Sequence, residues 1–106
     1  MAKIMFVLYR RADKSQEEFI AEWGGARHTS IVGKIPGVTK WIQDCVIYSP
    51  GAPVCDGVGE MWFENDRAME AAMKSPEMAA AFEDARRFLD LERSGMLVAE
   101  EKMVIG

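Results

Sequence analysis

The N-terminal segment Lys3–Arg10 constrains the fold more than any other part of the chain. Every residue from Ile4 to Tyr9 is apolar or aromatic. A strand with one face in water alternates apolar and polar residues, and this segment does not. It therefore predicts a β-strand covered on both faces. The apolar run is too short to cross a bilayer or to form a clear signal segment, so we expect a cytoplasmic protein without membrane association.

The next part of the chain predicts one interrupted helix and a hairpin. Ser15-Gln16-Glu17-Glu18 is a capping box that opens a helix, and Gly24-Gly25 predicts a kink or close approach within it. Two strands are expected at Val38–Tyr48 and Val54–Phe63. The turn-forming cluster Ser49–Pro53 separates them and indicates a hairpin.

The last part of the chain predicts two helices and a final strand. Asn65 or Asp66 caps a short helix, Arg67–Met73, and Ser75-Pro76 begins another that is expected to reach Leu91. Leu97–Ile105 is the last expected strand. The order βαββαβ is that of an α+β, ferredoxin-like domain: an antiparallel four-stranded sheet with helices on one face. The length of 106 residues predicts a single domain over residues 1–106.

Helices on one face leave the other face of such a sheet bare. That face is expected to carry about half of Ile4–Tyr9, together with Ile42, Val46, Val58 and Trp62. A monomer rarely exposes an apolar patch of this size, and a second copy related by two-fold symmetry covers it most simply. We therefore expect a homodimer. The alternative is that scattered exposed apolar residues are ordinary on a protein surface.

A symmetric hairpin around Pro50 predicts a specific register. The expected pairs are Thr39–Met61, Lys40–Glu60, Trp41–Gly59, Ile42–Val58, Gln43–Gly57, Asp44–Asp56 and Cys45–Cys55. Trp41 then lies beside Gly57 and Gly59, which leaves either a hollow for a ligand or simply room for the ring. Opposed aspartates could share a proton or hold a cation, but aspartates at the end of a loop are favoured. The two cysteines are expected to be reduced thiols.

His28 is the strongest candidate for chemistry. It is the only histidine, and its ordinary pKa near neutrality suits a general acid or base. Its helical position places it at the flank of an apolar face, at the mouth of the space between helix and sheet. The alternative is a histidine that only packs.

Several function classes are disfavoured by the sequence. The formal net charge is −4, and no basic run exceeds Arg86-Arg87, so nucleic-acid binding is not expected. The chain has no glycine-rich phosphate loop, no nucleophile elbow and no metalloprotease motif. We therefore expect neither a cofactor nor a metal.

Three segments together resemble the EthD family of dimeric α+β barrel proteins. They are the helix start RRADKSQEEF, the Trp23–His28 spacing that leads to Pro36-Gly37, and DGVGEMWFEN with the downstream SPEM. The resemblance covers nearly the whole chain. It implies a compact homodimer with a pocket between sheet and helices in each subunit. The family includes proteins encoded beside ether-degrading oxidation systems, fungal relatives acting on polyketides and methylmuconolactone methylisomerases.

The resemblance also locates candidate residues. Methylisomerase-like members pair the helix histidine with a tyrosine and a cysteine, and the matching positions here hold His28, Trp41 and Met61. Two proton-transfer groups are thus missing, which speaks against methylisomerase activity. His28 remains the candidate catalytic residue. The expected ligand-binding residues are Tyr9, Trp41, Cys45, Gly59 and Met61.

The sequence leaves three functions open. The first is a cofactor-independent isomerase, dehydratase or decarboxylase acting on a small apolar or aromatic carbonyl compound, with His28 moving a proton. The second is a non-catalytic accessory protein that binds a small apolar ligand for an oxidative degradation pathway. The third is a degenerate barrel that serves only assembly.

Overall fold

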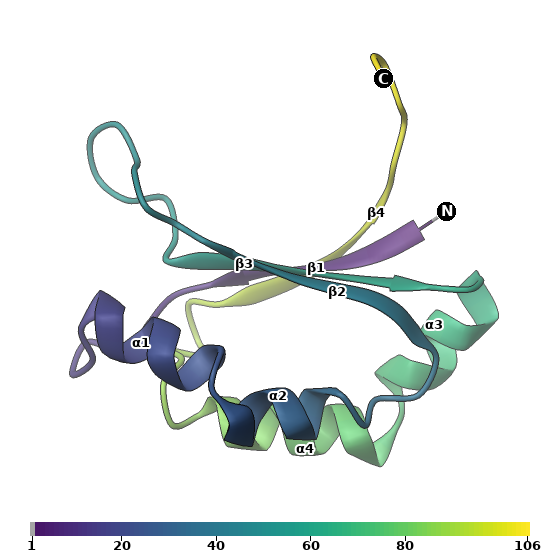
Figure 1. Cartoon of the computed structure of the whole chain (residues 1–106), viewed down its shortest axis with the longest axis horizontal. Coiled ribbons are helices and arrows are strands. Elements are labelled where there is room, and N and C mark those ends of the chain that lie inside the picture. The colour runs from purple at the N-terminus through teal and green to yellow at the C-terminus, as the bar shows by residue number, and fades with distance from the viewer. Residues whose placement is uncertain (1) are drawn as a thin grey trace.

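The apolar first strand, β1 (Ala2–Leu8), is an inner strand of the sheet. The computed structural model describes residues 2–106. Its elements are β1, α1 (Gln16–Trp23), α2 (Ala26–Val32), β2 (Val38–Cys45), β3 (Gly57–Phe63), α3 (Asp66–Met73), α4 (Pro76–Ala85) and β4 (Gly95–Glu100). The strands form one antiparallel sheet in the order β2-β3-β1-β4, with the helices on one face (Figure 1). The expected ferredoxin-like α+β fold is confirmed.

The local start and stop signals explain the helix boundaries. The Ser15 hydroxyl accepts from the Glu18 amide at 3.1 Å, and the Glu18 carboxylate accepts from the Ser15 amide at 2.9 Å. The kink expected at Gly24-Gly25 is a full break between α1 and α2. A Cβ on Gly25 would lie 2.6 Å from the Ala21 carbonyl oxygen, so only glycine fits this break.

The last helix is shorter than the sequence predicts. It ends at Ala85 and not near Leu91, and the chain continues through turns. Phe88 and Leu89, which follow the helix, are nevertheless buried in the core. The last strand likewise ends at Glu100, well before Ile105.

The predicted hairpin register is wrong by two residues. Trp41 pairs with Met61, Gln43 with Gly59 and Cys45 with Gly57. The strands stop well short of the turn cluster, so the hairpin loop runs over residues 46–56 and is not a tight turn. Side chains alternate with a period of two, so this slip leaves Lys40–Cys45 on their predicted faces. A bulge between Val38 and Lys40 interrupts the alternation, so Val38 packs against the core and Thr39 is exposed.

Other predicted pairs fail for the same reason. Asp44 faces Val58 and Lys40 faces Trp62, so neither the Asp44–Asp56 nor the Lys40–Glu60 pair forms. Glu60 instead accepts from the Lys3 ammonium of the neighbouring strand at 2.7 Å.

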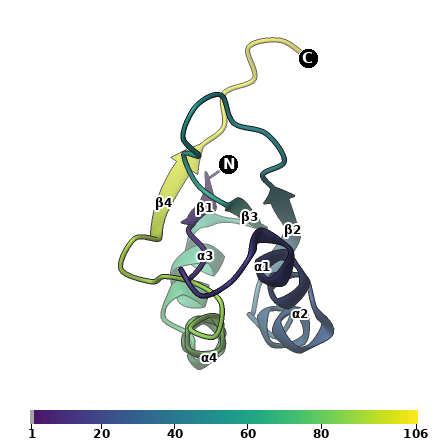
Figure 2. The ribbon, with the colours of Figure 1, turned by 90° about the vertical axis from the view of Figure 1, so that its left-hand side faces the viewer.

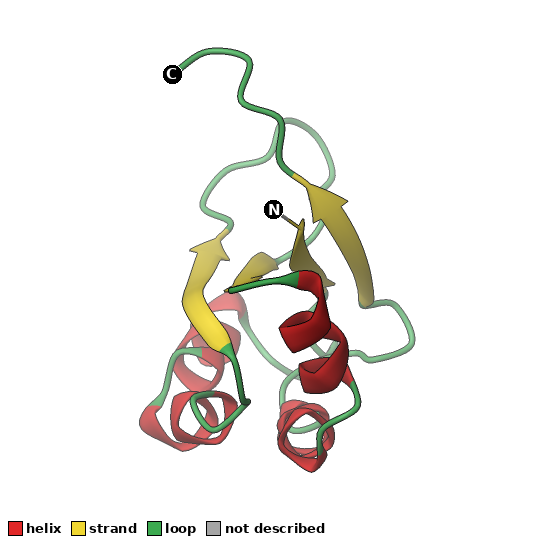
Figure 3. Cartoon of the chain, turned by 90° about the vertical axis from the view of Figure 1, so that its right-hand side faces the viewer, coloured by secondary structure: helices red, strands yellow, loops and turns green. Residues whose placement is uncertain are grey.

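Two pairs of helices cover the sheet and enclose the core. Figures 2 and 3 show α1 and α2 under the β2 side and α3 and α4 under the β4 side. One buried cluster includes Ile4, Met61 and Phe63, and the other includes Phe19 and Trp23. The candidate site lies against the sheet, between α2 of one pair and α4 of the other.

The face of the sheet away from the helices is mixed in character. Val7 and Val58 pair there. Farther along β3 on the same face, Trp62 lies between Lys3 and Lys40, whose ammonium groups are 4.9 and 4.7 Å from its ring. The hairpin loop and the C-terminal tail both rise on this side (Figure 1). Among residues 2–106, no helix is long and apolar enough to cross a membrane.

Candidate functional site

A small apolar cavity lies between the sheet and helices α2 and α4. Its volume is about 60 Å³. Four of the residues expected from the sequence line it together: His28, Trp41, Gly59 and Met61. The other lining residues are apolar: Phe6, Leu8, Trp23, Val32, Ile35, Met78, Ala81, Phe82, Ala85 and Leu89. His28 is thus the one titratable side chain in this lining, within the described part of the chain.

His28 is held in the cavity wall by a buried carboxylate. Its Nδ1 lies 3.0 Å from Oδ2 of Asp84, and both residues are buried. The Phe88 ring meets the imidazole edge-on, with 5.0 Å between ring centroids. The ring is therefore fixed by one polar and one aromatic contact, from α4 and from the turn that follows it.

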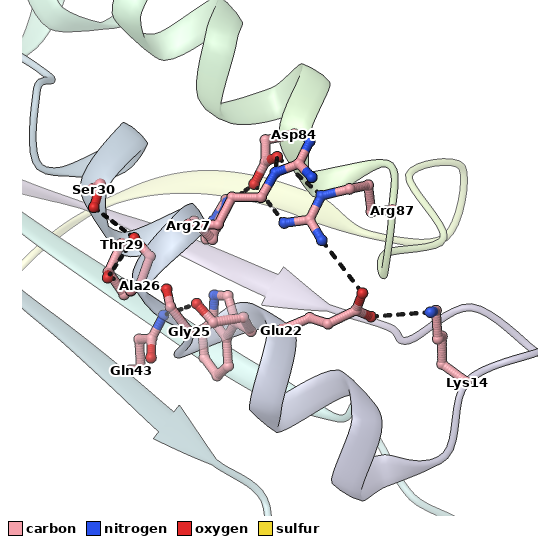
Figure 4. Close-up of polar contacts among 12 residues, drawn as sticks. Lys14, Glu22, Gly25, Ala26, Arg27, Thr29, Ser30, Gln43, Asp84 and Arg87 are labelled. Atoms are coloured by element: carbon pink, nitrogen blue, oxygen red, sulfur yellow. Dashed lines mark hydrogen bonds and ion pairs between the residues drawn. The ribbon is translucent and has the colours of Figure 1, made fainter.

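Two arginines neutralise the carboxylate that holds the histidine. Arg87 donates to both oxygens of Asp84 at 2.9 Å, and Arg27 donates to Oδ1 at 3.0 Å. Arg87 also reaches Glu22, which pairs with Lys14 at 3.2 Å, so charges of alternating sign continue to the surface (Figure 4). The arrangement joins α1, α2 and α4 around one buried negative charge.

These contacts set the charge state of both partners. The bidentate bond from Arg87 and the bond from His28 keep the pKa of the Asp84 carboxyl well below its ordinary value, although burial opposes this. Burial lowers the pKa of His28 from its ordinary value of 6.5, and this outweighs the opposite effect of Asp84. The imidazole is therefore neutral at pH 7.

The ionised carboxylate also fixes the tautomer. A carboxylate can only accept, so Nδ1 must carry the proton. The unprotonated lone pair then belongs to Nε2, the ring nitrogen that Asp84 does not bind. A neutral imidazole in an apolar cavity, oriented by a carboxylate, has the arrangement of a general base.

Tyr9 and Cys45, the two other residues expected at the site, do not line this cavity. The Tyr9 hydroxyl donates to the Val54 carbonyl in the hairpin loop, and the Arg93 guanidinium lies over its ring at 4.4 Å. Cys45 is exposed at the end of β2, and Cys55 is a buried free thiol.

The hollow expected beside the strand glycines is occupied by a different tryptophan. A Cβ on Gly57 would lie 2.8 Å from the Trp23 ring, so Trp23, not Trp41, fills the space above Gly57. Gly59 has room for a Cβ, whose nearest neighbour would be Phe6 at 3.5 Å. Gly59 is thus the glycine that contributes open space to the cavity.

The two aspartates of the hairpin do not face each other and lie in different surroundings. Asp56 accepts from the Arg10 amide at 2.9 Å and ties the loop to the end of β1. Asp44 is exposed on β2. Among residues 2–106, no cluster of three or more histidine, cysteine or acidic side chains is arranged to hold a metal.

Asp84 is the candidate site residue that the sequence reasoning missed. It lies in the polar run Glu83-Asp84, which suggests a solvated surface. Its spacing carried a signal nonetheless, because Ala81, three residues before, and Phe88, four residues after, belong to the apolar face. A carboxylate on that face predicts a buried charge with a partner.

Comparison with known proteins places the chain in a family. The model of the EthD domain matches residues 11–92. The chain belongs to the EthD family. Residues 11–92 include His28, Asp84 and every element that lines the cavity except β1. Among curated proteins, no relative matches this EthD-family chain.

Solved structures show the same fold. An ethyl tert-butyl ether degradation (EthD) family protein from Bacillus halodurans is 22% identical, with a TM-score of 0.77, over 96% of this chain and 100% of that one. A dimeric ferredoxin-like protein from Bacteroides fragilis is 16% identical, with a TM-score of 0.66 and coverage of 94% and 95%. A dimeric ferredoxin-like protein from Thermobifida fusca is 12% identical, with a TM-score of 0.66, over 94% of this chain and 90% of that one. At these identities the likeness concerns the fold alone.

Proposed function

We propose that this EthD-family protein binds a small, mostly apolar carbonyl or aromatic compound and moves a proton on it without a cofactor. The observation that carries the proposal is the neutral His28 imidazole, oriented by Asp84, in the wall of an otherwise apolar cavity. Apolar walls with a single oriented polar group are typical of small-molecule sites. The reaction class is isomerisation, dehydration or decarboxylation.

The proposed chemical step uses Nε2 as the base. An acidic C–H or O–H of the ligand donates its proton to Nε2, and its bonding electrons remain on the ligand as an enolate or phenolate. The resulting imidazolium is stabilised by the adjacent Asp84 carboxylate. Return of the proton to another atom completes an isomerisation, and its transfer to a departing hydroxyl completes a dehydration. One such group accelerates a reaction by about 10²- to 10⁴-fold, so the ligand must be intrinsically reactive.

Exchange of carbon-bound hydrogen in D₂O tests the proposed step without knowledge of the substrate. β-Diketones and unsaturated lactones serve as probes, and NMR follows the loss of the acidic proton. The wild-type protein should accelerate exchange, and His28→Gln should lose the acceleration while still binding the probe. Ser30→Ala, on the exposed side of α2, is the matched control and should behave as wild type. Equal exchange rates for wild type and His28→Gln would refute proton transfer by His28.

A second candidate function is that of a non-catalytic accessory protein in an oxidative degradation pathway. It is favoured by the lining itself, in which Trp41 and Met61 stand where methylisomerase-like members have proton-transfer groups. Under this function, probes raise the melting temperature but undergo no exchange. The same NMR experiment therefore separates the two functions.

We also propose that the protein works as a homodimer in a reducing, cytoplasmic compartment. The bare sheet face carries Val7, Val58 and Trp62, and the Bacteroides fragilis and Thermobifida fusca neighbours are both described as dimeric. Packing of two such faces buries a patch that a monomer would leave in water. The two cysteines are free thiols, which fits a reducing compartment.

A further inference from the structure

The cavity beside His28 is too small for the ligand class proposed for it. A volume of about 60 Å³ corresponds to roughly two water molecules, whereas an engineered protein cavity that binds benzene measures about 150 Å³. A ligand whose reactive end reaches His28 therefore has to extend into neighbouring space. We call the space beside His28 the inner chamber.

A second cavity adjoins the inner chamber on the β4 side. It measures about 340 Å³ and lies between β1, β4 and the end of α4. Four residues belong to both linings: Phe6, Leu8, Phe82 and Leu89. We call this second cavity the outer chamber. The two chambers therefore lie on opposite sides of one wall of four side chains.

The strand register shows how this wall is built. Phe6 pairs with Gly59 on one side and with Met96 on the other, and these three positions share the face under the helices. Gly59 lines the inner chamber and Met96 lines the outer one. Phe82 descends from α4 onto Phe6, with 6.2 Å between ring centroids and a 67° interplanar angle. These two rings form the part of the wall that joins sheet to helix.

Phe82 is the most exposed part of the wall. Its side chain is 39% exposed, whereas the other large aromatic residues of the core, such as Phe19 and Phe88, are fully buried. When a half-exposed ring turns away from its neighbours, less buried apolar surface is lost than when a fully buried ring does so. Displacement of Phe82 would join the chambers into one space that ends at His28.

The outer chamber suits an apolar occupant. Its polar side chains are already bonded: Ser94 accepts from the Tyr9 amide at 3.0 Å, and Arg86 pairs with Glu83 at 3.1 Å. The apolar remainder of the lining includes Leu91 and Met96 besides the shared wall. An occupant is therefore recognised by its apolar surface and not by a charge.

We infer that the outer chamber is a second binding subsite, which takes the apolar body of an elongated ligand while its acidic head contacts His28 in the inner chamber. The inference rests on the proposed function, because it assumes a ligand at His28. It names the ligand class more narrowly: an aromatic or enolic head that carries an alkyl or aryl extension.

Calorimetric titration with phenol, 4-methylphenol, 4-ethylphenol and 4-propylphenol tests the inference. The phenolic hydroxyl is the head that donates to Nε2, and each methylene enters the outer chamber. The dissociation constant of the wild-type protein should fall by about fourfold per methylene. Met96→Trp, which fills the outer chamber alone, should abolish this dependence of affinity on chain length.

The matched control is Val98→Trp. Val98 is the next residue on the same face of β4 and is 49% exposed, against 43% for Met96, but it lines neither chamber. It should keep the full dependence on chain length. If Met96→Trp does not melt cooperatively, Leu91→Trp replaces it, because Leu91 lines the outer chamber and not the inner one.

The outcomes separate this inference from the function on which it rests. Equal affinities for the four phenols in the wild-type protein, or an unchanged chain-length dependence in Met96→Trp, would overturn the outer subsite. If none of the four phenols binds, the proposed ligand site at His28 itself is overturned.

Discussion

Replacing Asp84 by asparagine should destabilise the protein more than any other single charge change at the site. The carboxylate is 4% exposed and accepts from His28, Arg27 and Arg87. Asparagine keeps the shape and one acceptor oxygen but removes the charge that the two guanidinium groups neutralise. Loss of one partner of a buried ion pair costs about 3–5 kcal/mol. Arg27 is 69% exposed and Arg87 29% exposed, so both regain water, and we expect about 3 kcal/mol, the lower end of that range.

Urea denaturation at pH 7 measures this loss, with Glu83→Gln as the matched control. Glu83 precedes Asp84 on α4 and pairs with Arg86 on the surface, where an ion pair contributes about 0–1 kcal/mol. The free energy of unfolding of Asp84→Asn should fall by about 3 kcal/mol at an unchanged urea dependence, and that of Glu83→Gln should scarcely change. Equal effects of the two substitutions would refute the view that Asp84 is the buried charge around which α2 and α4 are joined.

Three further predictions concern pH, packing and assembly. The pKa of His28 lies below 6.5 in the folded state, so the unfolded state binds more protons as pH falls below that value. The free energy of unfolding therefore decreases in this pH range. In a series of melting temperatures measured at different pH values, His28→Gln should flatten this decrease. Gly57→Ala should cost about 1–3 kcal/mol in urea denaturation, because its Cβ would meet Trp23 at 2.8 Å and that ring is stacked on Phe19; full stability would refute the tight packing. Val58→Glu, on the bare sheet face, should convert the proposed homodimer to a monomer in analytical ultracentrifugation, and an unchanged sedimentation coefficient would exclude that face as the interface.

The order of elements could be predicted because each has a local chemical signal. The Ser15 capping box, the Ser75-Pro76 helix start and the uninterrupted apolar strand all depend on residues close together in sequence. The faces of Lys40–Cys45 and of β3 were also predicted correctly, since alternation survives a slip of two residues, but the bulge at Thr39 was not predicted.

The register itself depends on contacts that sequence spacing does not show. The turn cluster predicts a tight hairpin, but the loop is held open by Asp56, whose amide donates to the Leu8 carbonyl at 2.8 Å and whose carboxylate accepts from Arg10. These partners lie on β1 and in the segment after it, far from the loop in sequence.

Only part of the candidate site could be predicted, because here too one contact joins residues far apart in sequence. His28 is unique in the chain and could be selected by its chemistry alone. Asp84 lies 56 residues away, and its pairing with His28 exists only because α2 and α4 pack side by side. The state of the imidazole, neutral and protonated on Nδ1, therefore follows from the tertiary structure and not from the sequence.

The ¹⁵N NMR spectrum of the single histidine at pH 7 tests the central claim most directly. A neutral imidazole shows two very different ring-nitrogen shifts, and their couplings to the ring protons identify the nitrogen that carries hydrogen. We expect a neutral His28 with the proton on Nδ1 in the wild-type protein, and loss of this single state in Asp84→Asn. A charged imidazole, or a proton on Nε2, would contradict the proposal that Asp84 orients His28 as a base toward the cavity.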